Sequence, residues 1–71
     1  MNYLQFLRKL RAYARVNGLK FEAVKNRGKG GHQMVHLGDR KTTIPAPNKE
    51  AKRGTLHAIL RQLGVGDDFE I

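Results

Sequence analysis

The chain must build its core from side-chain packing alone, because its 71 residues include no cysteine. A domain of this size buries only about 60% of the surface that the unfolded chain exposes, and neither disulfides nor zinc knuckles can reinforce it here. We therefore expect a single domain over residues 1–71 with a thin core and modest stability. A large enzyme with a deep, multi-walled pocket is excluded, and so is chemistry that needs a thiol.

The charge of the chain predicts a polyanionic partner. Lys and Arg number 14 and Asp and Glu number 6, which gives a formal net charge of +8. Such a balance is typical of proteins that bind nucleic acid, although many small domains are basic merely for solubility. The longest apolar run is only a few residues, so we expect neither a signal peptide nor a membrane span, and a cytoplasmic location.

Hydrophobic periodicity predicts two amphipathic helices. Apolar side chains recur at helical spacing from Tyr3 to about Val16, and again from a start near Lys52 until Gly64. Asn2 is placed to cap the first helix. Either Thr55 or Asn48 could cap the second.

The first helix also carries a basic row. It consists of Arg8, Arg11 and Arg15, which share a face beside the apolar stripe. Such a row is usually a solvated face, but it could also contact phosphates.

Three short strands are predicted between the helices, over residues 19–24, 32–37 and 40–44. Alternation places Leu19, Phe21 and Ala23 on one side of the first strand. In the second strand it places Val35 and Leu37 in the core, which leaves His32, Met34 and His36 on the open face. A pair of helices that cannot cover both faces of a sheet should pack on one. We therefore predict an α+β fold with a three-stranded antiparallel sheet and both helices on one face.

The connection between the first two strands is rich in glycine and basic residues. It reads Asn26-Arg27-Gly28-Lys29-Gly30-Gly31 and leads directly to His32. Glycines let backbone amides approach an anion closely. A neutral imidazole, with a pKa of about 6.5, can accept the proton of a ribose 2′-hydroxyl, and its acid form can donate one to a departing 5′-oxygen. The same residues also suit an ordinary hairpin that is followed by a surface histidine.

The other histidines do not complete a second site. Along one strand His32 and His36 are separated by about 13 Å between Cα atoms, too far to hold one ion jointly. We expect no metal and no cofactor. His36 is interpreted as a surface or minor-groove contact, and His57 as a partly buried packing residue.

A second basic cluster begins the last helix, at Lys52, Arg53 and Thr55. The dipole and unpaired amides of a helix start favour phosphate. Together with the order of elements, this cluster resembles the basic helix start of double-stranded RNA-binding domains. Near the C-terminus, residues 67–70 have the spacing of a capping box, which predicts a short turn that returns Phe69 to the core.

Three segments in this order resemble the HicA toxin family: Lys29-Gly30-Gly31-His32, Thr43-Ile44-Pro45 and Lys52-Arg53-Gly54-Thr55-Leu56. The similarity covers roughly residues 19–70. It implies a double-stranded RNA-binding-like α-β-β-β-α fold, an mRNA endoribonuclease that arrests translation, one catalytic histidine and a HicB-type antitoxin that covers that histidine. By motif the catalytic residue is His32. Gly31 stands where the family usually has serine.

The sequence thus predicts His32 as the catalytic residue, with RNA bound by Lys29, Gly30, Gly31, Lys52, Arg53 and Thr55. Two other functions remain open. The chain could be a non-catalytic RNA-binding module of the same fold, or an interaction subunit whose basic face binds only an acidic protein. RNA binding at different salt concentrations distinguishes the interaction subunit from the other two functions. The subunit would not bind RNA even at low salt, whereas phosphate binding weakens steeply as salt rises.

Overall fold

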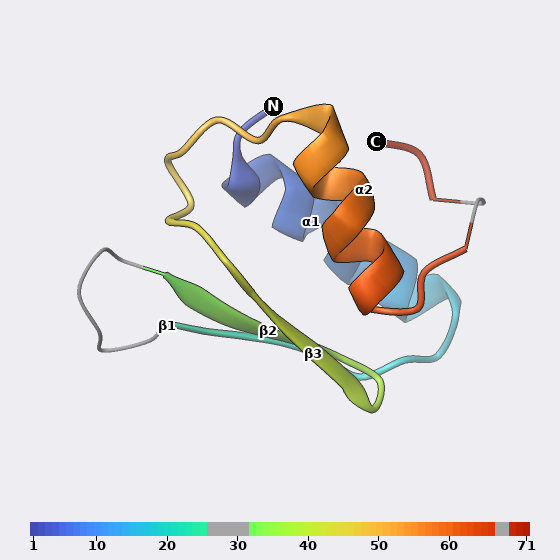
Figure 1. Cartoon of the computed structure of the whole chain (residues 1–71). Helices are drawn as coiled ribbons and strands as arrows, with labels where there is room; N and C mark the ends of the chain where they lie inside the picture. The colour runs from blue at the N-terminus through green and yellow to red at the C-terminus, as the bar shows by residue number, and fades with distance from the viewer. Residues whose placement is uncertain (26–31, 67–68) are drawn as a thin grey trace.

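A computed structural model of the chain describes residues 1–25, 32–66 and 69–71. Both helices lie on one face of the sheet, and none of the described helices or strands covers the other face (Figure 1). The predicted α+β class and the α-β-β-β-α order are confirmed. In chain order the elements are α1 (Tyr3–Val16), β1 (Phe21–Lys25), β2 (Gln33–Leu37), β3 (Arg40–Ile44) and α2 (Arg53–Gln62).

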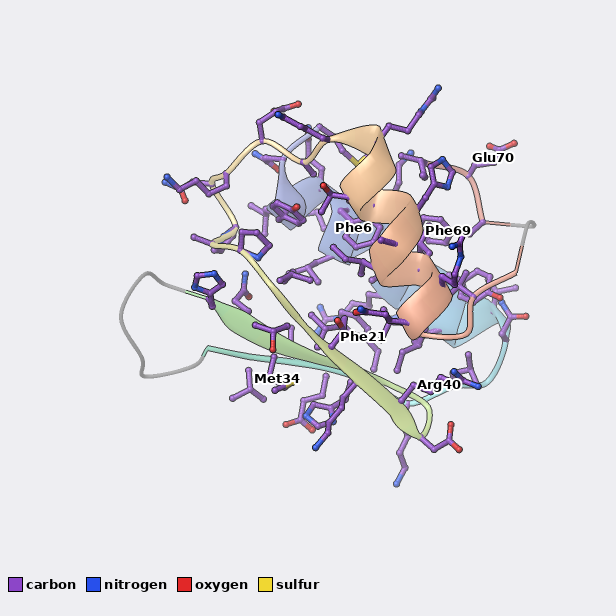
Figure 2. The ribbon with its side chains drawn as sticks, in the orientation of Figure 1. Phe6, Phe21, Met34, Arg40, Phe69 and Glu70 are labelled. Carbon is purple, nitrogen blue, oxygen red and sulfur yellow. The ribbon has the colours of Figure 1, made fainter. Side chains whose placement is uncertain are left out.

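The sheet is an antiparallel meander with β2 in the middle. Val35 of β2 lies opposite Ala23 of β1 and Thr42 of β3. Burial alternates along β2, so that its odd-numbered residues are buried and its even-numbered ones are half-buried. Figure 2 shows Met34 on the side of the sheet away from the helices, as alternation predicted.

The N-terminus of α1 is held by a capping box. The Asn2 side chain accepts a hydrogen bond from the Gln5 amide at 2.9 Å, and the Gln5 side chain accepts one from the Asn2 amide at 2.9 Å. These two bonds satisfy amides that a helix start would otherwise leave unpaired. The predicted capping role of Asn2 is confirmed, and so is the predicted buried stripe of Tyr3, Phe6, Leu7, Leu10 and Ala14.

Helix α2 begins without a side-chain cap. Its N-cap residue is Lys52, and no side chain there accepts a hydrogen bond from the first turn. The predicted start near Lys52 is right, whereas neither Thr55 nor Asn48 is the N-cap residue. The helix ends at Gln62, with Leu63 as its C-cap residue. Gly64 follows with a φ of 72°, which glycine adopts with little strain.

The C-terminal segment returns to α1. The Phe69 ring lies edge-on to Phe6 and Tyr13, with centroid separations of 5.9 Å and 5.6 Å. Phe6 and Phe69 are labelled in Figure 2. The predicted return of Phe69 to the core is confirmed. The turn predicted before it lies in part outside the described residues.

The first strand differs from its prediction. Leu19 lies outside β1 because its amide donates to the Ala14 carbonyl at 2.8 Å, which closes the end of α1. The strand therefore starts at Phe21. Of the side expected to be inward, only Phe21 packs against the core, whereas Leu19 is 41% exposed and Ala23 is exposed. Since β1 is an edge strand, this flank of the sheet is only partly covered.

Ile44 tests the placement of the core, because its side chain is 0% exposed. We expect Ile44→Val to lower the free energy of unfolding by about 0.5–1.5 kcal/mol, since a buried methylene is lost. Val16 is 84% exposed, so the control Val16→Ala should change it by less than about 0.5 kcal/mol. Urea unfolding followed by circular dichroism measures both. Equal losses would contradict this core.

Candidate functional site

His32 lies at one end of the sheet, directly before β2. The next residue, Gln33, pairs with Lys25 of β1 and with Ile44 of β3. The His32 side chain is exposed and makes no hydrogen bond or ion pair with any other described residue. An external substrate could therefore reach its imidazole. Because His32 precedes the first paired residue, alternation along β2 does not determine its direction, and its place on the open face stays a prediction.

Lys29, Gly30 and Gly31 fall between residues 26 and 31, outside the part of the chain that the structure describes. Their predicted contacts with RNA stay predictions. What the structure does describe is the pair of strand ends, at Lys25 and Gln33, that this segment connects.

The second predicted cluster is exposed at the start of α2. Lys52, Arg53 and Thr55 are all exposed, and the first turn holds no acidic residue. Since Lys52 makes no side-chain cap, that end of the helix retains its positive character. The turn is anchored by Leu56, which is 1% exposed. The arrangement suits an anion such as a phosphate.

The position of this helix start depends on the N-terminus of the chain. Backbone amides of Tyr3 and Leu4 donate to the carbonyls of Lys49 and Pro47, each at 3.1 Å. The amide of Ala51 donates to the Met1 carbonyl at 2.9 Å. These bonds hold the segment that leads into α2 against the start of α1.

The two predicted clusters are not in one place. In Figure 1 the start of α2 and the start of β2 are separated, with the segment between β3 and α2 running from one level to the other. The structure therefore does not join Lys52, Arg53 and Thr55 to His32 in one compact pocket. A ligand that contacted both would have to be extended.

Two further titratable side chains are Tyr3 and His36. Burial raises the pKa of the Tyr3 phenol. His36 is half-buried on the open face, opposite Glu22 and Lys41 in the strand register. Within residues 1–25, 32–66 and 69–71, no three histidine or carboxylate side chains gather as metal ligands would.

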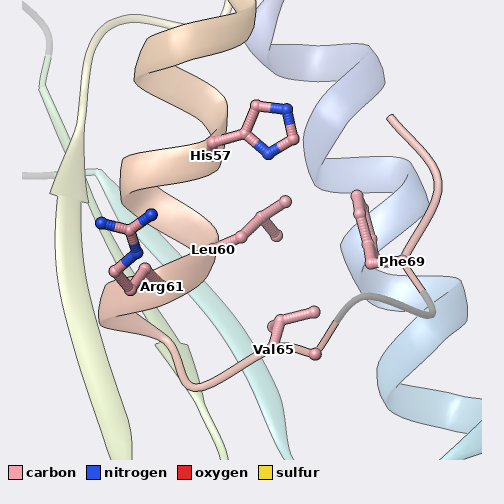
Figure 3. Close-up of a pocket in the computed structure, with 6 residues that line it drawn as sticks. His57, Leu60, Arg61, Val65 and Phe69 are labelled. Carbon is pink, nitrogen blue, oxygen red and sulfur yellow. The ribbon is translucent and has the colours of Figure 1, made fainter.

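His57 was predicted to be partly buried, and that prediction is wrong. Its side chain is exposed and lines a hollow of about 390 Å³ between α2 and the C-terminal segment, together with Leu60, Arg61, Val65, Gly66 and Phe69 (Figure 3). The neighbouring Leu56 is 1% exposed and already fills the core. One residue further along a helix points about 100° away, which carries His57 out of the stripe.

The exposure of His57 predicts a small effect on stability. We expect His57→Ala to change the free energy of unfolding by less than about 0.5 kcal/mol, as at other surface positions. Leu60 lines the same hollow but is 6% exposed, and Leu60→Ala should cost about 2–5 kcal/mol. Chemical denaturation of both variants measures the difference. A large decrease in the free energy of unfolding of His57→Ala would show that His57 does pack against the core.

Comparison with known families identifies the chain. A family model described as HicA toxin of bacterial toxin-antitoxin matches residues 14–65, which include all three strands and α2. The chain belongs to the HicA toxin family. It is therefore a toxin of a toxin-antitoxin system, and the resemblance found in the sequence is confirmed. Searches of curated proteins and of solved structures gave no significant match.

The family match leaves most of α1 outside, because it begins at Ala14. Helix α1 of this HicA toxin thus carries features that the family model does not cover, among them Arg8 and Arg11. Neither α1 nor α2, as the structure describes them, has the length and apolar character of a membrane span.

One feature of the HicA toxin was missed by the sequence. A second hollow lies between α1 and β1, and Gln33 is part of its lining. Strand alternation puts Gln33 on the same side of β2 as Val35 and Leu37, but a polar residue at a strand end is not expected to be buried. Only its burial draws attention to it.

Proposed function

We propose that this HicA toxin is a metal-independent endoribonuclease that cleaves mRNA and thereby arrests translation, with His32 as general acid or base. The observation that supports this most directly is the exposed imidazole of His32 at the end of the sheet. It directly follows the basic, glycine-rich connection in a chain that belongs to a toxin family. Cleavage of mRNA places its action in the cytoplasm.

The proposed reaction uses the substrate's own 2′-hydroxyl. Its oxygen attacks the adjacent phosphorus, and the bond from phosphorus to the 5′-oxygen breaks. The products are a 2′,3′-cyclic phosphate and a free 5′-hydroxyl. The base removes the proton of the 2′-hydroxyl, and the acid protonates the leaving 5′-oxygen.

His32 can perform either proton transfer, since a neutral imidazole accepts a proton and its conjugate acid donates one. One imidazole does not easily perform both in the same turnover. Lys29 or a water molecule completes the transfer in this proposal. No step requires a metal ion or a cofactor.

The start of α2 serves binding in this proposal. Lys52 and Arg53 contact phosphates, and Thr55 adds its hydroxyl and amide. Because this helix start is separated from the start of β2, these residues hold a phosphate other than the one that is cleaved. An extended single strand of RNA meets that requirement.

A HicB-type antitoxin is the proposed regulator. An acidic antitoxin surface that covers His32 would block access of RNA and neutralise part of the +8 charge. Inhibition and RNA binding then compete for the same face of the toxin.

Loss of cleavage in His32→Ala tests the catalytic role. Purified wild type is expected to cut a labelled single-stranded RNA in EDTA, whereas His32→Ala should be slower by about 100-fold or more, since general acid-base catalysis is lost. His57→Ala is the matched control and should cut like the wild type. Fragments are followed on a gel, and their ends are read by mass spectrometry.

Two results would contradict the mechanism. Undiminished cleavage by His32→Ala would remove that residue from the chemistry. A linear 3′-hydroxyl end on the upstream fragment would exclude attack by the 2′-hydroxyl.

A non-catalytic RNA-binding module is the second candidate. The uncapped, exposed and basic start of α2 favours it, because this cluster could hold phosphates whether or not His32 acts. Binding without cleavage by the wild type would support this module. Absence of RNA binding even at low salt would instead favour a subunit that binds only an acidic protein.

The salt dependence of RNA binding tests the role of Lys52 and Arg53. In the His32→Ala background, which avoids cleavage, each alanine substitution should weaken binding of different sequences to a similar extent. It should also reduce the slope of log K against log salt by about 0.7 for single-stranded RNA. Lys9→Ala, an exposed site on α1, is the control. Fluorescence anisotropy over a salt series measures the slopes, and unchanged slopes would argue against these contacts.

A further inference from the structure

A hollow of about 290 Å³ lies between α1 and the edge strand β1. We call it the α1–β1 groove. Its size is near the lower end of small-molecule binding sites, which start at about 300 Å³. It is lined by Leu4, Leu7, Arg8, Arg11, Phe21, Ala23 and Gln33.

Gln33 differs from the other buried residues because its side chain is polar. It is 5% exposed and is the one polar residue in the described core. Its amide nitrogen is buried and has no hydrogen-bond partner among the described residues. Leaving a buried donor unpaired destabilises the folded chain, whereas an apolar side chain at the same position would not carry this penalty. A polar side chain at this position is explained if a ligand in the groove accepts a hydrogen bond from its amide.

The Gln33 amide can reach such an acceptor by a small motion. Rotation about the last bond of a glutamine side chain has broad minima, so its amide group turns at little cost. The nitrogen can therefore move from its buried position toward a ligand without displacement of β2.

Two guanidinium groups border the same groove. Arg8 and Arg11 are exposed, lie one turn apart on α1 and form no ion pair with any described carboxylate. Helix α1 itself contains no acidic residue. The groove thus combines apolar walls, a buried donor and a cationic border, which matches a molecule with a flat apolar body, an acceptor and a negative charge.

We propose that the α1–β1 groove binds one nucleotide of the RNA. The base packs against Leu4, Leu7 and Phe21 and accepts a hydrogen bond from the Gln33 amide, while Arg8 and Arg11 contact the phosphate. Stacking of unpaired bases on aromatic side chains is a common mode of single-strand recognition.

This inference rests on the proposed function in one respect, namely that the bound nucleotide belongs to the RNA that is cleaved at His32. Gln33 directly follows His32, so their Cα atoms lie about 3.8 Å apart. A base in the groove would therefore belong to a nucleotide close to the cleaved phosphate. The groove then determines which base is preferred beside the cut.

The experiment is an NMR titration of the isotope-labelled full chain with the four 5′-mononucleotides at low salt. These ligands contain no phosphodiester bond, so the result does not depend on cleavage. We expect saturable shifts of the Gln33 side-chain amide and of the Ala23 methyl group for at least one nucleotide. Inorganic phosphate alone should leave the Gln33 amide unshifted.

Variants assign the contacts. Gln33→Met keeps the length of the side chain without the donor, and should weaken nucleotide binding by about 3- to 10-fold. It should also unfold at a urea concentration no lower than that of the wild type, because it removes a buried amide that no described residue pairs. Arg8→Ala and Arg11→Ala should each weaken binding to a similar degree. Arg15→Ala, on the same helix but outside the groove, should not.

The outcomes separate this inference from the proposed function. Nucleotide shifts at Gln33 in a chain that cuts no RNA would contradict the nuclease and leave the groove as a nucleotide site. RNA cleavage without any shift at Gln33 would overturn the groove proposal alone. The proposal would also be overturned if Arg8→Ala and Arg11→Ala weakened only the complex with the antitoxin, because the groove would then be a protein interface.

Discussion

The burial of one face of a three-stranded sheet under two helices is the constraint on which the structure depends. Phe6 and Leu10 of α1 and Val35 and Ile44 of the sheet are each 0% exposed, and Leu56 of α2 completes their contact. No disulfide supplements this packing. Because the core is small, the apolar stripes of both helices are needed to form it. The polar and charged side chains that could take part in chemistry therefore lie on the open sheet face, at the strand ends and at the helix starts.

The positive charges that the structure describes lie on the surface of the chain, where few carboxylates are near them. Within the described residues, the salt bridge is between the Met1 amine and Glu50, so the arginines of α1 and the basic start of α2 are left without carboxylate partners. Like charges spread over so small a surface lower the stability of the folded chain. An anionic partner relieves that repulsion, whether it is RNA or an acidic antitoxin. Under the proposed function, RNA and an acidic antitoxin would both be attracted by this positive charge.

Local patterns predicted much of this fold correctly, and the errors have local causes. The capping role of Asn2 and the core stripe of α1 depend on residues close in sequence, and both are confirmed. Leu19 was misplaced because its amide completes the end of α1, a bond that strand alternation does not reveal. His57 was misplaced because proximity to an apolar stripe does not determine whether a side chain is covered. The motif residues His32, Lys52, Arg53 and Thr55 were recognisable in sequence, but their separation in space was not.

By itself the sequence determined the order of elements, the inward face of β2 and the family, because these follow from periodicity and from short motifs. Only the tertiary structure decided how completely each face is covered. The incomplete cover over β1 opens the α1–β1 groove. The pairing of β2 within the sheet brings to its lining the amide of Gln33, which is buried and has no partner among the described residues. The reason is physical: alternation determines the side of the sheet on which a residue lies, whereas burial and satisfied hydrogen bonds depend on neighbours that are distant in sequence.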